Sequence, residues 1–251
     1  MSEEAKALTR WENREELGEL LAQTAAAMGV ALAPPTVESF LVYGEMLTDW
    51  NTRMNLTAIT EPREVVIKHF ADCLTLLPVV EPAGKTVIDV GTGAGFPGLP
   101  LKLACPAAAV TLADALQKRL NFLAAVQTAL GVEGLTLRHG RAEDLGREAG
   151  LRESFDLCVS RAVADLPVLM EYGLPFVKVG GRLAALKGPG LPQELARSEQ
   201  ALARLGGRVV LAEETLIPGT DLKHHLLVVE KVAPTPKTYP RKPAAIQKKP
   251  L

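Results

Sequence analysis

The chain has 251 residues, of which 47% are hydrophobic and 23% are charged, and its formal net charge is −1. This composition is that of an ordinary globular protein and excludes low-complexity and fibrous classes. No apolar run approaches the roughly 20 residues of a membrane-spanning helix. Residues 1–6 lack the basic-then-apolar order of a signal peptide, and the three cysteines are widely spaced. We therefore expect a cytoplasmic protein with reduced thiols, and since the histidines show no ligand spacing, no metal.

The first part of the chain, residues 1–80, predicts a helical cap. Apolar residues recur at helical spacing in two stretches that are separated by Pro34 and Pro35. A third helix is predicted over 63–77, with Pro62 in its first turn, where proline is tolerated.

Residues 81–233 alternate between strands and helices, a rhythm that specifies a mainly parallel sheet with helices on both faces. Too few residues separate the last two strands for a helix, so we expect that pair to be antiparallel and the sheet to have seven strands. The strands are predicted at 86–90, 109–113, 135–139, 155–160, 182–187, 207–212 and 224–231.

A glycine-dense turn follows the first predicted strand. Asp89 ends an apolar run, and Gly91, Gly93 and Gly95 follow it before the chain becomes helical. Glycines allow positive φ and let the backbone approach a ligand closely. In open α/β sheets, ligands bind outside the carboxyl end of such a strand. The alternative is a strand-to-helix corner that binds nothing.

The type of cofactor depends on the prolines and the acid of this turn. Gly93 to Gly98 also matches the dinucleotide pattern G-x-G-x-x-G. However, Pro97 and Pro100 remove N–H donors that a pyrophosphate needs. Asp89 instead places a carboxylate beside a cationic ligand, and S-adenosylmethionine carries an ammonium and a sulfonium. We therefore predict a class I S-adenosylmethionine-dependent methyltransferase fold: a Rossmann-like seven-strand sheet with an N-terminal helical cap.

Two further acids follow the next two strands. Asp114 ends the second strand, about 20 residues beyond the glycines, the distance at which a carboxylate reaches ribose hydroxyls. Its other possible role is the N-cap of a helix over 115–130. Ala142 and Glu143 follow the third strand, where such folds meet the adenine edge. Taken alone, Glu143 would more often be a solvated acid at a helix start, but its place as the third acid after a third strand favours the binding role.

The tail, residues 234–251, is rich in proline and basic residues and has no acid. Proline is expected to keep it extended along a surface, and its positive charges are suited to phosphates. A disordered terminus that only aids solubility is the alternative. Its basic residues are Lys237, Arg241, Lys242, Lys248 and Lys249.

Six segments together resemble the RsmG (GidB) family of bacterial 16S ribosomal RNA guanine-N7 methyltransferases. They are Trp50-Asn-x-x-x-Asn-Leu-Thr-Ala-Ile59, the turn from Asp89 to Pro100, Lys118-Arg119-x-x-Phe-Leu, Gly140-Arg-Ala-Glu143, Ser160-Arg-Ala162 and Tyr239-Pro-Arg241. The resemblance runs from about residue 35 to the end. The tail departs from the family pattern at Pro243-Ala-Ala-Ile246, which leaves its path open.

This resemblance implies methyl transfer from S-adenosylmethionine to N7 of a specific guanine in 16S rRNA, within the small subunit or an assembly intermediate. It implies a cofactor site formed by the glycine turn with Phe96, by Asp114, Ala115 and Leu116, by Ala142 and Glu143, and by Arg161. We expect a monomer.

On the acceptor side, Arg161 follows the fourth strand and is suited to pair with the methionine carboxylate or the acceptor base. Asn55 either closes over the site or is a turn residue. Lys187 is a third candidate. An RNA-binding rim is expected at Arg53, Lys118, Arg119, Lys187 and the basic tail residues.

The motifs also bear on the reaction. Guanine N7 carries no proton, so direct in-line attack needs no general base and no covalent intermediate on the enzyme. Ser160-Arg-Ala162 differs from the Asn-Pro-Pro-aromatic motif of amino methylation, and Cys158 lies within a strand, as expected of a core residue. Two alternatives stay open: a small-molecule methyltransferase and a non-catalytic RNA-binding protein.

Overall fold

The computed structural model describes residues 10–251. The amino-terminal segment 1–6, on which the absence of a signal peptide was argued, lies outside the described residues. Within residues 10–251, none of the helices combines the length and apolar character needed to cross a membrane.

The described chain begins with helices, as predicted. Proline residues begin two of them, Pro34 in α2 and Pro62 in α3, where a missing N–H costs no helical hydrogen bond. The predicted third helix runs without a break from α3 through a π-helical turn, η1, to α4. π-helical turns are rare and occur frequently at functional sites. The bounds are α1 Arg14–Ala27, α2 Pro34–Asn51, α3 Pro62–Val65, η1 Val66–Ala71, α4 Asp72–Leu74 and α5 Leu77–Val80.

A seven-strand sheet follows, in the order β3-β2-β1-β4-β5-β7-β6. The first five strands are parallel, and β7 inserts antiparallel between β5 and β6. This arrangement confirms the predicted class I methyltransferase fold. The strands are β1 Thr86–Val90, β2 Ala109–Asp114, β3 Leu135–His139, β4 Phe155–Arg161, β5 Val177–Lys187, β6 Gly207–Leu216 and β7 Lys223–Lys231.

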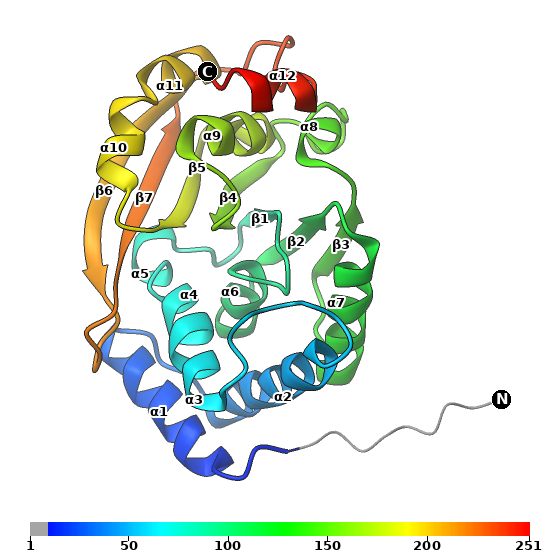
Figure 1. The fold of residues 1–251 in the computed structure, drawn as a ribbon, viewed down its shortest axis with the longest axis vertical. Coiled ribbons are helices and arrows are strands. Elements are labelled where there is room, and N and C mark those ends of the chain that lie inside the picture. Colours follow the sequence, from blue (N-terminus) through cyan, green and yellow to red (C-terminus); the bar gives the residue numbers. More distant parts are fainter. Residues whose placement is uncertain (1–9) are drawn as a thin grey trace, which may run out of the picture.

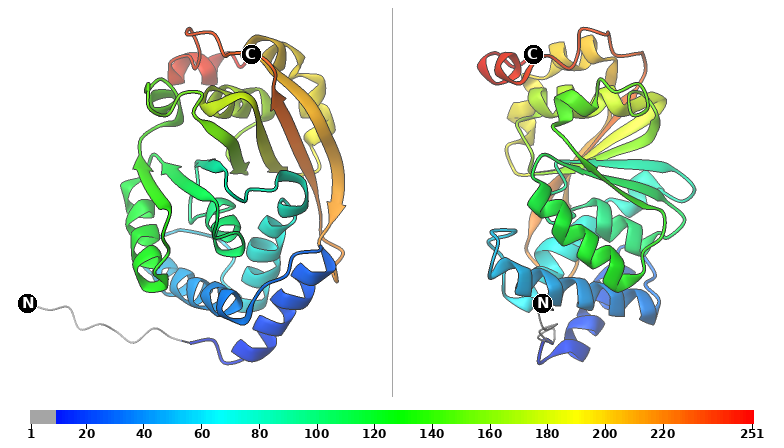
Figure 2. Two further views of the ribbon diagram at one scale, coloured as in Figure 1. Left: turned by 180° about the vertical axis from the view of Figure 1, so that it is seen from behind. Right: turned by 90° about the vertical axis from the view of Figure 1, so that its right-hand side faces the viewer.

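Helices cover both faces of this sheet (Figures 1 and 2). Neighbouring residues on β1 show the two sides: Val87 packs in the core cluster shared with the amino-terminal helices, whereas Ile88 packs in the cluster on the other face. Successive strand residues point to opposite faces, which explains the alternation. The helices after β1 are α6 Gly98–Ala104, α7 Gln117–Leu130, α8 Ala142–Leu145, α9 Leu166–Gly173, η2 Leu174–Phe176, α10 Leu191–Ala196 and α11 Glu199–Leu205.

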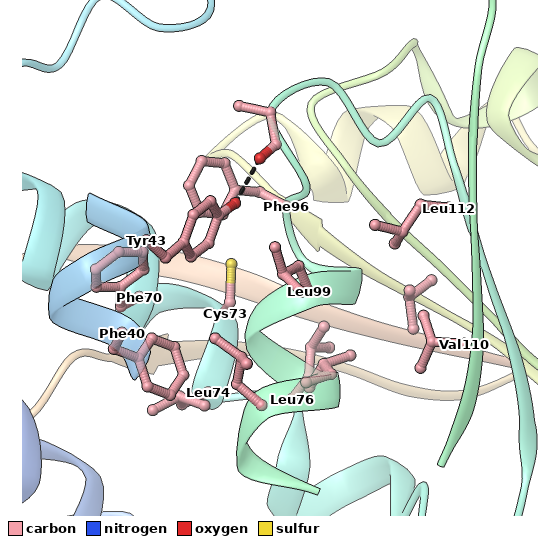
Figure 3. Close-up of a cluster of buried hydrophobic side chains, with 14 of the residues drawn as sticks. Phe40, Tyr43, Phe70, Cys73, Leu74, Leu76, Phe96, Leu99, Val110 and Leu112 are labelled. Atoms are coloured by element: carbon pink, nitrogen blue, oxygen red, sulfur yellow. Dashed lines mark hydrogen bonds between the residues drawn. The ribbon is translucent and has the colours of Figure 1, made fainter. Parts of the chain in front are cut away.

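The helical cap and the sheet share one hydrophobic core. Figure 3 shows Phe40 and Tyr43 of α2 beside Phe70 of η1, with Phe96 and Leu99 from the segment after β1. The buried Tyr43 hydroxyl donates a hydrogen bond to the carbonyl of Ala94. The cap therefore holds the glycine turn directly. The division at 80/81 and 233/234 remains a prediction.

The tail follows the predicted path only in part: residues 234–242 form no helix and pack along the protein, whereas residues 243–248 are helical. Pro243 begins a helix, α12 Pro243–Lys248, and Ile246 of this helix is buried. Arg152 donates hydrogen bonds to the tail carbonyls of Thr235 and Tyr239. The expectation was wrong for residues 243–248 because proline is tolerated in the first turn of a helix, and Pro243 begins one there.

Candidate functional site

A cavity of about 530 Å³ lies at the carboxyl ends of the central strands. The strand order changes direction between β1 and β4, which is the point where open α/β sheets bind ligands. The cavity is lined by the glycine turn, by the segments after β2 and β3 and by the end of β4, together with residues of helical segments and a loop. These are Leu56 and Thr57 after α2, His69 of η1 and Tyr172 of α9.

The glycine turn forms the floor of this cavity. Gly91 and Gly93 line it, and a Cβ built on Gly93 would meet no protein atom within 4 Å. The space that a side chain would take here is therefore left free. Gly95 does not line the cavity; a Cβ there would lie 2.7 Å from the Tyr43 hydroxyl oxygen. Only glycine fits at Gly95, where φ is also +108°.

Asp89 lies behind the turn and does not line the cavity. Its side chain is fully buried, and Oδ2 accepts hydrogen bonds from the Thr92 hydroxyl at 2.7 Å and the Gly98 N–H at 2.8 Å. Oδ1 has no hydrogen-bond partner in the described structure. Burial raises the pKa of this carboxyl to about 7, against the two hydrogen bonds. Asp89 thus shapes the turn, and its predicted contact with the cofactor stays a prediction.

Asp114 joins the tip of β2 to the glycine turn. Its carboxylate accepts the N–H of Gly93 at 2.9 Å and that of Leu116 at 2.8 Å. Arg119 pairs with it at 3.2 Å. The following helix begins at Gln117 with Leu116 as its N-cap, so the N-cap role considered for Asp114 is wrong. Ala115 and Leu116 line the cavity beside it.

Ala142 and Glu143 line the cavity after β3. The Glu143 side chain is 6% exposed, and no hydrogen bond to its carboxylate is found among residues 10–251. The carboxylate is therefore open to the cavity rather than enclosed by protein. A ligand that offers an N–H group at this wall would find a free acceptor in the Glu143 carboxylate. The exocyclic amino group of adenine is such a donor.

Arg161 forms a network at the end of β4. Its guanidinium donates to the Lys68 carbonyl at 3.1 Å, to Asp72 Oδ2 at 3.0 Å and to His69 Nδ1 at 3.0 Å. It also lies 4.6 Å from the centroid of the Phe96 ring. Arg161 and Phe96, both predicted, thus meet at one wall of the cavity.

Sequence reasoning missed several residues at this wall. His69 of η1 stacks on Phe96 with centroids 4.5 Å apart and hydrogen-bonds to the Thr57 hydroxyl at 2.8 Å. Burial, then the charge of Arg161, lowers the pKa of His69 to about 4. A single histidine has no spacing pattern that could have marked it in the sequence. Thr57, in contrast, lies within the Asn-Leu-Thr-Ala-Ile motif, which could have pointed to it.

The loop that carries Thr57 connects α2 to α3 and is held by Asn51. The Asn51 side-chain oxygen accepts the N–H groups of Leu56 at 2.8 Å and Thr57 at 3.0 Å. Asn55 is exposed and lines a smaller cavity formed by residues 55–58, beside the main one. Because Leu56 and Thr57 line both cavities, Asn55 lies at the rim.

Other predicted residues lie away from the cavity. The Lys187 ammonium donates to the Ala164 carbonyl at 2.9 Å and pairs with Glu194 at 2.6 Å. Arg241 pairs with the fully buried Glu171 at 2.6 Å.

The remaining basic residues of the predicted RNA-binding rim are exposed. Arg53 pairs with Asp49 at 2.6 Å, while the rest form no ion pair within the part of the chain that the structure describes. They are Lys118, Lys237, Lys242, Lys248 and Lys249.

Within residues 10–251, no group of three or more histidine, cysteine or acidic side chains is arranged to hold a metal ion. Cys73, Cys105 and Cys158 are free thiols, and Cys158 is buried.

The residues fit the predicted cofactor. An open floor at Gly93, the acid Asp114 at the tip of β2 and the partnerless Glu143 carboxylate after β3 suit an adenosine with its ribose and amino group. Together with the strand order 3-2-1-4-5-7-6, they define a class I S-adenosylmethionine-dependent methyltransferase.

The comparisons with known proteins identify the family. The model of the GidB family, described as rRNA small subunit methyltransferase G, matches residues 36–218, and the chain belongs to this family. A ribosomal RNA small subunit methyltransferase G from Clostridium perfringens is 46% identical over 234 residues, 93% of this chain and 98% of the relative. One from Alkaliphilus metalliredigens is 49% identical over 226 residues, 89% and 94% of the two chains.

Solved structures show the same fold. A mutant 16S rRNA adenine-N1 methyltransferase from Catenulisporales acidiphilia with its cosubstrate SAM has a TM-score of 0.51 and 20% identity, covering 62% of this chain and 89% of that one. TrmN from Thermus thermophilus has a TM-score of 0.50 and 20% identity, covering 66% and 53%. The solved structures show the fold, whereas membership of the rRNA small subunit methyltransferase G family makes the protein an S-adenosylmethionine-dependent rRNA methyltransferase and removes the non-catalytic alternative.

Proposed function

We propose that this protein transfers the methyl group of S-adenosylmethionine to N7 of a specific guanine in 16S rRNA of the small ribosomal subunit, in the cytoplasm. The observation that carries the proposal is that His69, the one histidine among residues 10–251 that lines the cavity, has no nitrogen available as a base. Arg161 occupies Nδ1 and Thr57 occupies Nε2. Guanine N7 has a lone pair and no proton, so it needs no base. The small-subunit rRNA substrate of the relatives supports the choice of RNA.

Residues on three strand ends would hold the cofactor. Gly91 and Gly93 leave room for the cofactor to approach the backbone, Asp114 would bind the ribose hydroxyls, and Ala142 and Glu143 would face the adenine. When bound, the cofactor supplies an electrophilic methyl group.

The described side chains contribute alignment and electrostatics to the reaction. Phe96 offers a ring face at the cavity wall, and Arg161 supplies a fixed positive charge above that ring. Cys73 and Cys158 are buried and do not line the cavity, and burial raises the pKa of both thiols. Direct attack by N7, without a covalent intermediate on a cysteine, agrees with this arrangement.

Exposed positive charges would position the RNA. The tail packs against the segment that follows α8, where Arg147 donates to the Thr238 carbonyl at 3.2 Å. The first residues of α8 line the cavity, and α12 lies beside α8 (Figure 1). Lys237, Lys242, Lys248 and Lys249 are exposed there and are suited to phosphate contacts, which position RNA without reading its sequence.

The test uses methyl-labelled S-adenosylmethionine and small subunits from a strain that lacks this enzyme. After transfer, the 16S rRNA is digested and the labelled nucleoside is identified. Labelled 7-methylguanosine at a single site supports the proposal. A different labelled nucleoside, or no transfer to subunits and naked RNA despite measurable cofactor binding, contradicts it.

The family does not support the small-molecule acceptor that the sequence left open, and the tail charges test whether RNA is bound. Deleting the tail is unsuitable because Thr235, Arg241 and Ile246 are built into the fold. The double variant Lys237→Ala/Lys248→Ala keeps these contacts. For an RNA substrate, each lost phosphate contact lowers the salt dependence of binding by about one in slope.

The matched control is Lys178→Ala/Lys223→Ala, which also removes two exposed lysines. Only the tail variant is expected to weaken subunit binding. Equal binding and transfer by both double variants would favour a small acceptor.

A further inference from the structure

Three side chains form a chain of hydrogen bonds that ends in the cavity. Arg161 Nη2 lies 3.0 Å from His69 Nδ1, and His69 Nε2 lies 2.8 Å from the Thr57 hydroxyl oxygen. That oxygen also accepts the N–H of Ile59 at 3.0 Å. The three side chains come from β4, η1 and the loop before α3, so only the folded chain brings them together.

The direction of each hydrogen bond follows from Arg161. His69 Nδ1 also lies 3.2 Å from the Lys68 carbonyl, which would need a proton on Nδ1. The guanidinium of Arg161 has donors only, lies closer at 3.0 Å and itself donates to that carbonyl, so Nδ1 accepts from Arg161. The neutral imidazole then carries its proton on Nε2 and donates it to Thr57. Burial and the nearby Arg161 charge hold the pKa of His69 at about 4, which keeps the ring neutral at pH 7.

Thr57 therefore has only its own proton left to offer. A hydroxyl has two acceptor lone pairs and one proton, and His69 and Ile59 occupy both lone pairs. No hydrogen bond among residues 10–251 takes the Thr57 proton, and Thr57 lines the cavity. This end of the cavity is on the β4 side of β1, whereas Asp114 and Glu143 are on the β2 and β3 side.

We propose that Thr57 is a specificity-determining residue that donates its hydroxyl proton to O6 of the acceptor guanine, beside the N7 that receives the methyl group. The inference rests on the proposed guanine-N7 reaction. The Hoogsteen edge of guanine presents N7 and O6 as acceptors, whereas adenine presents N7 and an amino donor. Because both lone pairs of the Thr57 hydroxyl are occupied, it cannot accept a hydrogen bond from the amino group of adenine. With adenine, two donors would face each other. His69 and Arg161 act through Thr57 as positioning residues.

The experiment is a double-mutant cycle between Thr57 and the target base. Reconstituted small subunits carry guanine, inosine or 2-aminopurine at the methylated position; inosine keeps O6, and 2-aminopurine lacks it. Wild type, Thr57→Val, Thr57→Ser and the control Thr128→Val are compared by kcat/KM for methyl transfer. Thr128 is an exposed α7 residue whose hydroxyl donates to the Ala124 carbonyl, so the control removes a hydroxyl from the surface.

Thr57→Val is expected to lower kcat/KM on guanine and inosine about 10- to 100-fold, the effect of losing one buried hydrogen bond. Thr57→Ser and Thr128→Val are expected to stay near wild type, and cofactor affinity is expected to be unchanged. Replacing guanine by 2-aminopurine should lower kcat/KM of the wild type by a similar factor. The same replacement should not lower kcat/KM of Thr57→Val any further.

The inference is overturned if the losses of kcat/KM from Thr57→Val and from 2-aminopurine are additive. It is also overturned if Thr57→Val keeps full activity. If Thr57→Val does not fold, wild type decides: equal rates on inosine and 2-aminopurine overturn the inference. A labelled nucleoside other than 7-methylguanosine refutes the proposed function itself. 7-Methylguanosine combined with additive losses refutes only the role of Thr57.

Discussion

The two ends of the cavity are built in different ways. At the β2 and β3 end, Asp114 and Glu143 lie at or just after a strand, and Asp114 is tied to backbone N–H groups of Gly93 and Leu116. At the β4 end, Thr57, His69 and Arg161 are linked side chain to side chain across three segments. The first end follows from local strand-turn chemistry, and the second depends on the packing of the helical cap against the sheet.

The difference separates Arg161, which is part of the fold, from the Glu143 carboxylate, which is not hydrogen-bonded to the described residues. Arg161 satisfies Asp72, His69 and a backbone carbonyl, so changes at the β4 end disturb the fold. Glu143 has no hydrogen-bond partner among the described residues, so changes there are expected to alter ligand binding alone.

The largest effect is expected from Arg161→Lys. An ammonium keeps the charge but not the fork that reaches Lys68, Asp72 and His69 together. Breaking a buried ion-pair network costs about 3–5 kcal/mol, and we expect a loss of unfolding free energy of that order in urea titrations. Methyl transfer should fall with it.

The matched control is Arg53→Lys, at an exposed pair with Asp49, which should change stability by less than about 1 kcal/mol. A similar stability of the two lysine variants would mean that the β4 end is no more structural than the surface.

The pH dependence of stability comes next. The folded pKa of His69 is about 4, below the unfolded value of about 6.5, so the unfolded state binds the proton more tightly. The contribution of His69 to the free energy of unfolding is fully present above pH 6.5 and is lost as the pH falls through 4. The total loss is about 3 kcal/mol. His69→Gln should lose less unfolding free energy than wild type between pH 7.5 and pH 4.

His139→Gln, at an exposed histidine, serves as the control and should follow wild type across the same range. If His69→Gln also follows wild type, His69 is not held neutral by burial and Arg161.

The smallest effect is expected from Glu143→Gln. Replacing the carboxylate by an amide should weaken S-adenosylmethionine binding about tenfold, or about 1.4 kcal/mol, in isothermal titration calorimetry. Unfolding free energy should not fall, because no described protein donor loses its acceptor. Asp144→Asn, the next residue on α8 and exposed, is the control and should leave the Kd unchanged. A stability loss without a change in Kd would make Glu143 a structural acid.

Much of the first end was predicted from local pattern. Strands at 86–90 and 135–139 have the bounds that apolar runs indicated, and Asp114, Ala142 and Glu143 line the cavity as expected. These features depend on a few neighbouring residues, since a parallel sheet brings all strand ends to one edge. The path of the tail was predicted only in part, for the opposite reason. Its packing depends on Arg152 and Glu171, which are far away in the sequence.

By itself, the sequence determined the sheet class, the position of the glycine turn and the family, because hydrophobic periodicity and short motifs act over a few residues. The tertiary structure alone decided that Asp89 lies behind the turn, that Lys187 and Arg241 are held in ion pairs away from the cavity, and that His69 and Thr57 face it. Those outcomes depend on which side chains meet when the cap packs on the sheet. Burial and hydrogen-bond direction then fix what each group can donate or accept.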